Sequence, residues 1–141
     1  MPKDRTSTSN ASRTTLRRVL CWAATLAWAG VIFGFSALPG SVIPGGAAEY
    51  GHLGEYAVFG ALLYAALRID LSRSNALSAA IVIASLYGIT DEFHQHFVWM
   101  RTPDVLDWAA DTLGATVGAC LALAAEKALR HGRSADARET V

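Results

Sequence analysis

The feature that most constrains this chain is an uncharged apolar stretch near its N-terminus, residues 19–36. As a helix rising about 1.5 Å per residue, this stretch is roughly 27 Å long, close to the thickness of the hydrocarbon core of a bilayer. It is apolar all round rather than along one stripe, which argues against a helix of a soluble four-helix bundle. It is also longer than the apolar core of a cleaved signal peptide, and no clean small-residue cleavage site follows it. The stretch therefore predicts a membrane-spanning helix.

Three further segments repeat the pattern. Residues 52–67, 75–90 and 108–125 are largely apolar, and residues 37–51 form a Gly- and Pro-rich loop before them. The second and third segments are short for a full span unless their helices extend into the flanking residues. Small-residue spacings at Gly30-x-x-x-Gly34 and Gly114-x-x-x-Gly118 would let helices approach closely in lipid. We expect an all-α fold, a polytopic membrane protein with a bundle of four transmembrane helices.

The charges are segregated along the chain. Lys and Arg total 12 and Asp and Glu total 12, so there is no basic surplus of the kind that nucleic-acid binding requires. Eleven of the 12 basic residues lie before residue 19, between residues 68 and 74 or after residue 125, and the twelfth is Arg101. By the positive-inside rule, both termini are expected in the cytoplasm. The expected organisation is a disordered basic cytoplasmic tail (1–18), a four-helix membrane domain (19–125) and a polar cytoplasmic tail (126–141).

The ionisable groups gather on the opposite, outer side. At helical spacing, residues three or four apart share a helix face, so most members of each run would lie together. If the third helix continues beyond residue 90, Glu92 is the member expected to point elsewhere. The runs are His52, Glu55 and Tyr56 in the second segment, Asp91, Glu92, His94 and Gln95 after the third, and Arg101, Asp107 and Asp111 in the last loop and the fourth segment.

Antiparallel helices would bring these runs to one cavity. Ionisable groups at membrane depth are costly unless they are paired or face water, and such clusters are more often functional than accidental. The candidate general acids and bases are His52, Glu55, Asp91, Glu92 and His94. The candidate ligand contacts are Tyr56, Gln95, Arg101, Asp107 and Asp111, with Arg101 suited to an anionic group. An alternative is a cluster that only ties the helix ends together, in which Arg101 pairs with Asp91 or Asp107.

Neither a metal site nor a cofactor is predicted. His94 and His96 are two residues apart and cannot share a helix face, and the sequence has no H-E-x-x-H motif. Cys21 and Cys120 lie inside predicted spans, where we expect them to behave as small apolar residues. No Ser neighbours a His in the sequence, so a Ser nucleophile is not expected.

The same runs resemble the VanZ-like family, over roughly residues 19–125. The segment that carries most of the resemblance is Y-G-I-T-D-E-F-H-Q at residues 87–95, with Arg101 and Asp107 downstream. Weaker points of similarity are Phe35, Ser36, Pro39, His52, Tyr56, Gly60, Phe97, Val98, Asp111, Thr112, Leu113, Gly114 and Gly118. The family motif positions carried over are His52, Tyr56, Asp91, Glu92, His94, Gln95, Arg101, Asp107 and Gly114.

The resemblance implies a small protein of the bacterial plasma (inner) membrane. It also implies a link to low-level resistance to the glycopeptide antibiotic teicoplanin, for which the family is named. Two departures stand out. Many relatives have an Asp-Lys pair shortly before the first His, where residues 47–49 here are Ala-Ala-Glu. Many also have Pro-Gly before the Arg, where Trp99 and Met100 stand here.

Together these features predict an envelope protein whose outer polar site binds or modifies a cell-wall or lipid-linked ligand. Two alternatives stay open: a non-enzymatic membrane binding or transport protein, and a structural partner of a larger envelope complex. Whether the site is catalytic is not decided by the residues. The expected partners are membrane lipids, the lipid-linked or cell-wall ligand, and a second copy of the chain or another membrane protein.

Overall fold

Four helices make up the described part of the chain. The computed structural model describes residues 5–42 and 47–139, with side chains described for residues 9–42 and 51–132. The helices are α1 (Arg5–Ser36), α2 (Ala47–Leu67), α3 (Arg73–Gln95) and α4 (Val105–Glu139), with a short 3-10 helix, η1 (Gly40–Val42), after α1. None of the described residues lies in a strand, so the expected all-α class is confirmed.

Three of the helices are long and apolar enough to cross a membrane. These are α1 over Ser9–Ser36, α3 over Arg73–Gln95 and α4 over Val105–Gly132. By length and composition the chain is therefore a membrane protein, as the uncharged stretch at residues 19–36 predicts. The fourth helix, α2, contacts each of the other three and lies between them.

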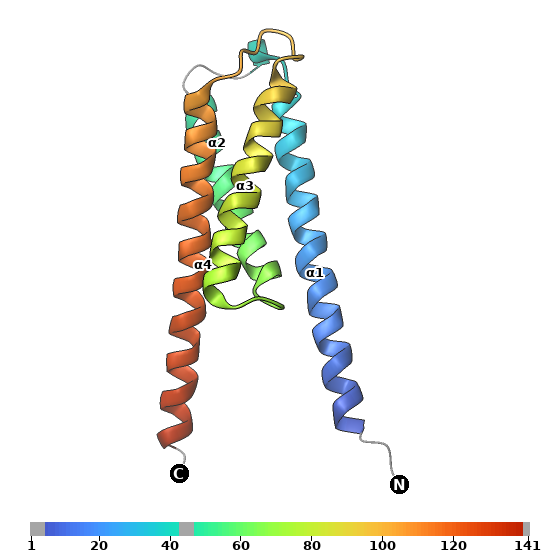
Figure 1. Cartoon of the computed structure of the whole chain (residues 1–141), viewed down its shortest axis with the longest axis vertical. Helices are drawn as coiled ribbons and strands as arrows, with labels where there is room; N and C mark the ends of the chain where they lie inside the picture. The colour runs from blue at the N-terminus through green and yellow to red at the C-terminus, as the bar shows by residue number, and fades with distance from the viewer. Residues whose placement is uncertain (1–4, 43–46, 140–141) are drawn as a thin grey trace.

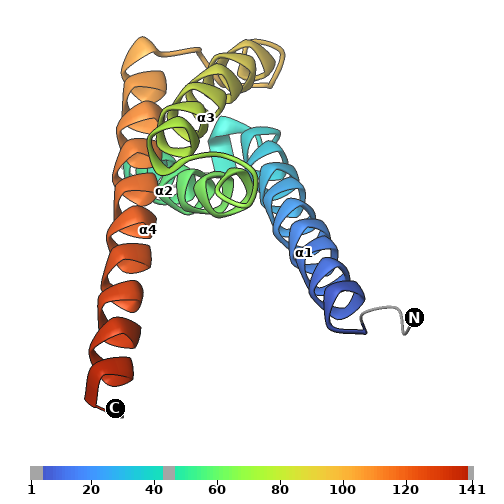
Figure 2. The same ribbon diagram turned by 60° about the horizontal axis from the view of Figure 1, so that its bottom comes forward.

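The helices run alternately up and down (Figure 1). α2 and α3 form an antiparallel hairpin, and α1 and α4 lie on opposite sides of it in both views (Figures 1 and 2). α1 begins and α4 ends at the same end of the molecule. We call this the basic end. The polar end is the opposite one, where α1 and α3 finish and α2 and α4 begin.

Each helix is longer than the apolar segment from which it was expected. α1 starts at Arg5, so residues 5–18, which were expected to be disordered, are helical. Once an apolar span has nucleated a helix, each added residue brings a hydrogen bond at little further cost. The hydroxyl groups of Thr14 and Thr15 also donate to the carbonyls of Asn10 and Ala11 one turn earlier. α2 and α3 likewise extend into the flanking residues and have 21 and 23 residues. They are therefore longer than the apolar segments 52–67 and 75–90, which are short for a full span.

Small residues bring α2 and α4 into close contact. A Cβ atom added to Gly60 of α2 would overlap the backbone of Ala115 in α4. In α4, a Cβ at Gly114 would overlap the backbone of Leu53, and one at Gly118 would overlap that of Ala57. The expected close approach at Gly114-x-x-x-Gly118 is therefore confirmed. Gly30 and Gly34 of α1, by contrast, would meet nothing within 4 Å among the described residues.

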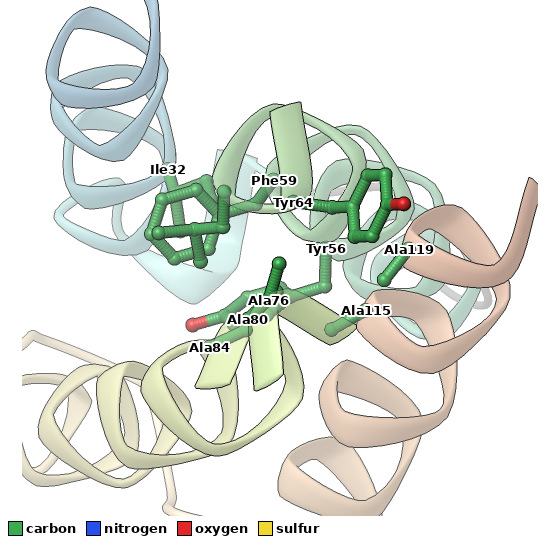
Figure 3. Packing of buried hydrophobic residues seen from close by; sticks show 10 residues of the cluster. Ile32, Tyr56, Phe59, Tyr64, Ala76, Ala80, Ala84, Ala115 and Ala119 are labelled. Atoms are coloured by element: carbon green, nitrogen blue, oxygen red, sulfur yellow. The ribbon is translucent and has the colours of Figure 1, made fainter. Parts of the chain in front are cut away.

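A column of alanines on α3 completes the core. Ala76, Ala80 and Ala84 are fully buried at a spacing of four residues, which places them on one face of the helix. Figure 3 shows this column beside Tyr56 of α2, with Ala115 and Ala119 of α4 nearby. One and two turns further toward the polar end, the same face carries Gly88 and Asp91. The packed face of α3 thus leads directly into the polar cluster described below.

Ion pairs join the helices at the basic end. Arg18 of α1 pairs with Asp70 in the turn between α2 and α3. Glu126 of α4 accepts from the Tyr64 hydroxyl at 2.6 Å and pairs with Arg68, Arg73 and Arg130. The segregation of charge seen in the sequence therefore becomes a separation between the two ends of the molecule.

Candidate functional site

A buried histidine and aspartate form the centre of the polar end. His52 of α2 and Asp111 of α4 are joined by a 3.0 Å contact between His52 Nδ1 and Asp111 Oδ1. His52 is 7% exposed and Asp111 is fully buried. Gly88 of α3 makes room for the carboxylate, since a Cβ there would lie 3.1 Å from Asp111 Oδ2. Three helices thus build this pair.

Glu92 of α3 lies beside the start of α4. Its Oε2 atom accepts a 2.7 Å hydrogen bond from the backbone N–H of Asp104. A carboxylate oxygen of Glu92 also lies within 4.8 Å of a ring nitrogen of His52 and of a carboxylate oxygen of Asp107. Helical spacing sets Glu92 off the face of α3 that carries Asp91, His94 and Gln95, and Glu92 lies instead beside site residues of α2 and α4. The reason is that α4 packs along the side of α3, so two adjacent faces of α3 are covered.

Asp104 connects Glu92 to the N-terminus of α4. Its side chain accepts from the backbone N–H of Leu106 at 2.8 Å and so caps the N-terminus of α4. Its own backbone N–H is directed at Glu92. Asp107 then follows in the first turn of α4, where a carboxylate is favoured by the helix dipole. Asp104 was not among the expected site residues, although an Asp directly before an apolar segment is a recognisable N-cap signal.

Asp91, His94 and Gln95 occupy the other side of the α3 end. The amide of Gln95 donates to Asp91 Oδ2 over 3.5 Å, and both residues are buried. The His94 ring stacks on Phe33 of α1, with 4.4 Å between ring centroids. His94 therefore faces α1, whereas Glu92 faces α4. Ser36, the last residue of α1, is also buried here and was not among the expected site residues.

Tyr56 is central to the site and Glu55 is at its margin. The Tyr56 side chain has no exposed surface, and its ring packs edge-on against Phe59 and tilted against Tyr87. The side chain of Glu55 is half-buried, and its backbone carbonyl accepts from the Trp28 indole N–H at 2.9 Å.

Arg101 lies in the loop that closes the polar end. Its Nε atom donates to the carbonyl of Leu38, 3.3 Å away, in the loop after α1. A second bond ties the two loops, from the Gly40 N–H to the Trp99 carbonyl. Among the described ion pairs none involves Arg101, so the structural alternative in which it pairs with Asp91 or Asp107 is not what the described residues form.

Many polar atoms at this end are buried without a hydrogen-bond partner. Buried polar atoms are normally paired, so a group of unpaired ones in one region needs an explanation. All lie at or near the polar end, on residues of α1, α2, α3 and α4. They are Ser36 Oγ, Tyr56 Oη, Asp91 Oδ1, Glu92 Oε1, His94 Nε2, Gln95 Oε1 and Asp111 Oδ2.

An apolar cavity of about 300 Å³ adjoins this group between α3 and the start of α4. Glu92 and Asp104 are its polar lining residues, and the rest are apolar. The apolar lining residues are Ile89, Pro103, Val105 and Trp108. The Trp108 indole donates to the Ser85 carbonyl at 3.1 Å, which fixes one wall of the cavity. Trp108 and Ile89 were not expected in the site, because apolar residues at helical spacing carry no distinguishing signal in a membrane helix.

The comparison with known families agrees with the motifs. The model of the VanZ/LLP1 family matches residues 13–126, a range that reaches into all four helices and includes every residue of the polar end discussed above. No curated protein and no solved structure matches the chain. The family match covers well over half of the sequence and confirms the resemblance carried by residues 87–95. The chain is therefore a membrane protein that belongs to the VanZ/LLP1 family.

Proposed function

We propose that all four helices cross the membrane, with α2 as the fourth span. α2 has 21 residues, contacts the other three helices and runs from the polar end toward the basic end. An α-helix satisfies its backbone hydrogen bonds within itself, and a helix of this length reaches roughly 31 Å, enough to cross the hydrocarbon core of a bilayer. The basic end then lies in the cytoplasm and the polar end outside, by the positive-inside rule.

The proposed function is binding of a lipid-linked envelope ligand at the polar end. The observation that carries this proposal is that Glu92, one of the residues with a buried, unpaired polar atom, also lines an apolar cavity. A polar region beside an apolar cavity suits a molecule with a polar head and a hydrocarbon part. The head would take up the unpaired hydrogen-bonding groups, and the hydrocarbon part would lie against Ile89, Val105 and Trp108.

Two further features support an outer, interfacial ligand. Arg101 is the one basic residue of the two loops at this end, and its guanidinium group suits a phosphate or carboxylate. Large apolar side chains around the end of α3 are strongly exposed, including Phe93, Phe97 and Trp99 at 68%, 71% and 77%. Exposed aromatic residues are typical of the membrane–water interface.

The alternative, a polar cluster that only holds the helix ends together, accounts less well for the unpaired polar atoms. A cluster that only ties helices together would be expected to satisfy its own hydrogen bonds, because each unsatisfied buried group costs about 1–3 kcal/mol. At the basic end, Glu126 meets that expectation through Tyr64, Arg68 and Arg73. The contrast between the two ends favours a ligand at the polar end.

A photo-crosslinking experiment tests lipid binding directly. The wild-type chain in nanodiscs would be exposed to a photoactivatable isoprenoid phosphate, and the labelled peptides would be identified by mass spectrometry. We expect label on the wall formed by α3 and α4, and its loss in Ile89→Trp, which fills the cavity. Val82→Trp is the matched control, because Val82 lies two turns away on the same face of α3, is 55% exposed and does not line the cavity. Equal labelling of both variants would contradict the proposal.

A cell-based experiment tests the link to glycopeptides. Wild type and Arg101→Ala would be expressed at matched membrane levels in a Gram-positive host, and binding of labelled teicoplanin to the cells would be measured. We expect the wild type to lower teicoplanin binding and Arg101→Ala to restore it. No change with the wild type would overturn the resistance link and leave the lipid proposal to the crosslinking experiment.

A further inference from the structure

The inference concerns three side chains from three helices that meet at the polar end. One donor atom each from His52 of α2, Glu92 of α3 and Asp107 of α4 lies within 4.8 Å of the other two. His52 and Glu92 are buried and Asp107 is partly buried. In the sequence these residues lie far apart, so no ligand spacing was visible there. We propose that His52, Glu92 and Asp107 form a binding site for a divalent transition-metal ion, with zinc as the best fit.

The spacing of the three donors is close to that of a zinc site. Zinc binds nitrogen and oxygen ligands at about 2.0–2.2 Å, so two donors on a tetrahedral ion are about 3.3–3.6 Å apart. The three donor atoms lie within 4.8 Å of one another, so drawing them onto an ion requires each to move by up to about 1 Å. Side-chain rotation alone supplies such a movement, and the helices stay where they are.

Asp111 holds His52 in the orientation that a metal ligand needs. The His52 Nδ1 atom is engaged by Asp111 Oδ1 at 3.0 Å. A carboxylate in this position stabilises the proton on Nδ1, so that Nε2 keeps its lone pair for an ion. A metal-bound histidine almost always has such a partner on its other ring nitrogen, and the partner fixes the tautomer and the ring orientation.

Glu92 is prepared in a similar way. Its Oε2 atom is fixed by the Asp104 N–H at 2.7 Å, and its Oε1 atom is buried without a hydrogen-bond partner. Glu92 itself is 8% exposed. A buried carboxylate near an imidazole and a second carboxylate is costly unless a cation or a proton compensates its charge.

The charges around the site also call for a cation. Glu92, Asp107 and Asp111 bring three carboxylates to one imidazole. Among the ion pairs of the described residues, none joins a Lys or Arg to any of these three carboxylates, and the neutral imidazole that binds a metal brings no charge. A divalent ion would balance the two carboxylates that bind it. The imidazole ligand favours zinc over magnesium or calcium, which prefer sites made of oxygen alone.

Three protein ligands would leave a further coordination position open. Zinc sites with three protein ligands hold water or a ligand in the fourth position. The neighbouring apolar cavity includes Glu92 in its lining, so that position would be reachable from the cavity. The metal proposal does not depend on the lipid proposal, because an ion can bind with water in the open position.

Zinc binding to the full-length chain tests the site. The purified protein in detergent would be stripped with EDTA, and binding of Zn²⁺ would be measured by competition with a fluorescent chelator. We expect one Zn²⁺ per chain for the wild type, and loss of this stoichiometric binding in Glu92→Gln and Asp107→Asn. Asp111→Asn, which alters only the partner of His52, should weaken binding by about 10–100-fold. Cobalt substitution should give the visible absorption of a tetrahedral ion in the wild type, but not in Glu92→Gln or Asp107→Asn.

Two variants control for unspecific binding and for misfolding. His96→Ala removes an exposed loop histidine, and Asp70→Asn removes an exposed carboxylate at the basic end. Both should bind zinc like the wild type. Zn²⁺ should also raise the melting temperature of the wild type and of these controls, but not that of Glu92→Gln. Absence of stoichiometric binding in the wild type, or unchanged binding in both Glu92→Gln and Asp107→Asn, would overturn the proposal. Failure of the lipid crosslinking would leave these results untouched.

Discussion

At the scale of single residues, the His52–Asp111 pair is fixed by burial, by a short contact and by the space that a glycine leaves beside it. Both side chains are buried, the atoms are 3.0 Å apart, and Gly88 supplies the space beside them. Removing one partner of a buried pair leaves the other uncompensated, and such changes cost about 3–5 kcal/mol. An exposed pair costs far less, because water replaces the lost partner.

This contrast gives a prediction for a double-mutant cycle. Asp111→Ala should lower the free energy of unfolding of the EDTA-treated protein by about 3–5 kcal/mol. The double variant with His52→Ala should lose less than the sum of the two single changes. The control is Arg18 and Asp70, whose side chains are 45% and 50% exposed and whose coupling should stay below about 1 kcal/mol. The measurement is unfolding in a denaturing detergent, and strictly additive losses at His52 and Asp111 would contradict the prediction.

Met100 has a backbone conformation that suits glycine better. It is the one non-glycine residue with positive φ in the described chain, at 57°, directly before Arg101. The glycine that the family resemblance leads us to expect at this position would adopt this conformation without strain. The side chain is 67% exposed, so it loses few contacts when removed.

We therefore expect Met100→Gly to stabilise the loop. Relative to Met100→Ala, which keeps a Cβ in the left-handed region, Met100→Gly should be more stable by about 1 kcal/mol. Melting temperatures of the two variants, measured side by side in detergent, give the comparison. An alanine variant as stable as the glycine variant would mean that the Cβ atom carries no strain at this position.

At the scale of helices, contact between α2 and α4 depends on the absence of side chains. Gly60, Gly114 and Gly118 each lie where a Cβ would overlap the backbone of the facing helix. In lipid, close approach of this kind provides the van der Waals contact that holds helices together. The same contact brings His52 to Asp111, so packing and site geometry are coupled.

Enlarging Gly118 should separate these two helices. Gly118→Leu must displace the backbone at Ala57, and we expect a loss of about 3 kcal/mol, at the upper end of overpacking costs. Gly34→Leu is the matched control, since Gly34 lies in a similar spacing on α1 but meets nothing within 4 Å. Thermal stability in detergent should fall for Gly118→Leu and stay near the wild type for Gly34→Leu. Equal losses for the two variants would show that the close approach of α2 and α4 is not the cause.

The two glycine pairs also show how far the sequence predicts the fold. Apolar length identifies spanning helices well, because a bilayer requires about 20 apolar residues. It does not tell Gly118 from Gly34, since both satisfy the same spacing and only packing separates them. Glu92 is a similar case: helical spacing sets it off the face of Asp91, His94 and Gln95, and only the position of α4 shows that it lies near His52 and Asp107. The ends of the helices were also missed, because polar residues extend a helix that an apolar core has started.

At the scale of the whole molecule, arginine-rich ion pairs lie at one end and a cluster of histidine and carboxylate side chains lies at the other. Glu126, Arg68 and Arg73 meet at one end, and His52, Glu92 and Asp111 at the other. α1 begins and α4 ends at the same end (Figure 1), an arrangement that agrees with the four proposed crossings. The role of α2 is therefore the point on which the topology depends.

Labelling of single cysteines decides whether α2 crosses the membrane. In a background with Cys21→Ala and Cys120→Ala, a cysteine would be placed by Ser41→Cys in η1 or by Ser74→Cys at the start of α3, and both positions are exposed. An impermeant maleimide applied to intact cells should label Ser41→Cys, and should label Ser74→Cys only after lysis. The two positions flank α2, so this difference in labelling requires that α2 lies between the two sides of the membrane. Labelling of both, or of neither, in intact cells would mean that α2 does not span. Labelling of Ser74→Cys alone would keep four spans but reverse their orientation, and would place the polar end in the cytoplasm, out of reach of a cell-wall ligand.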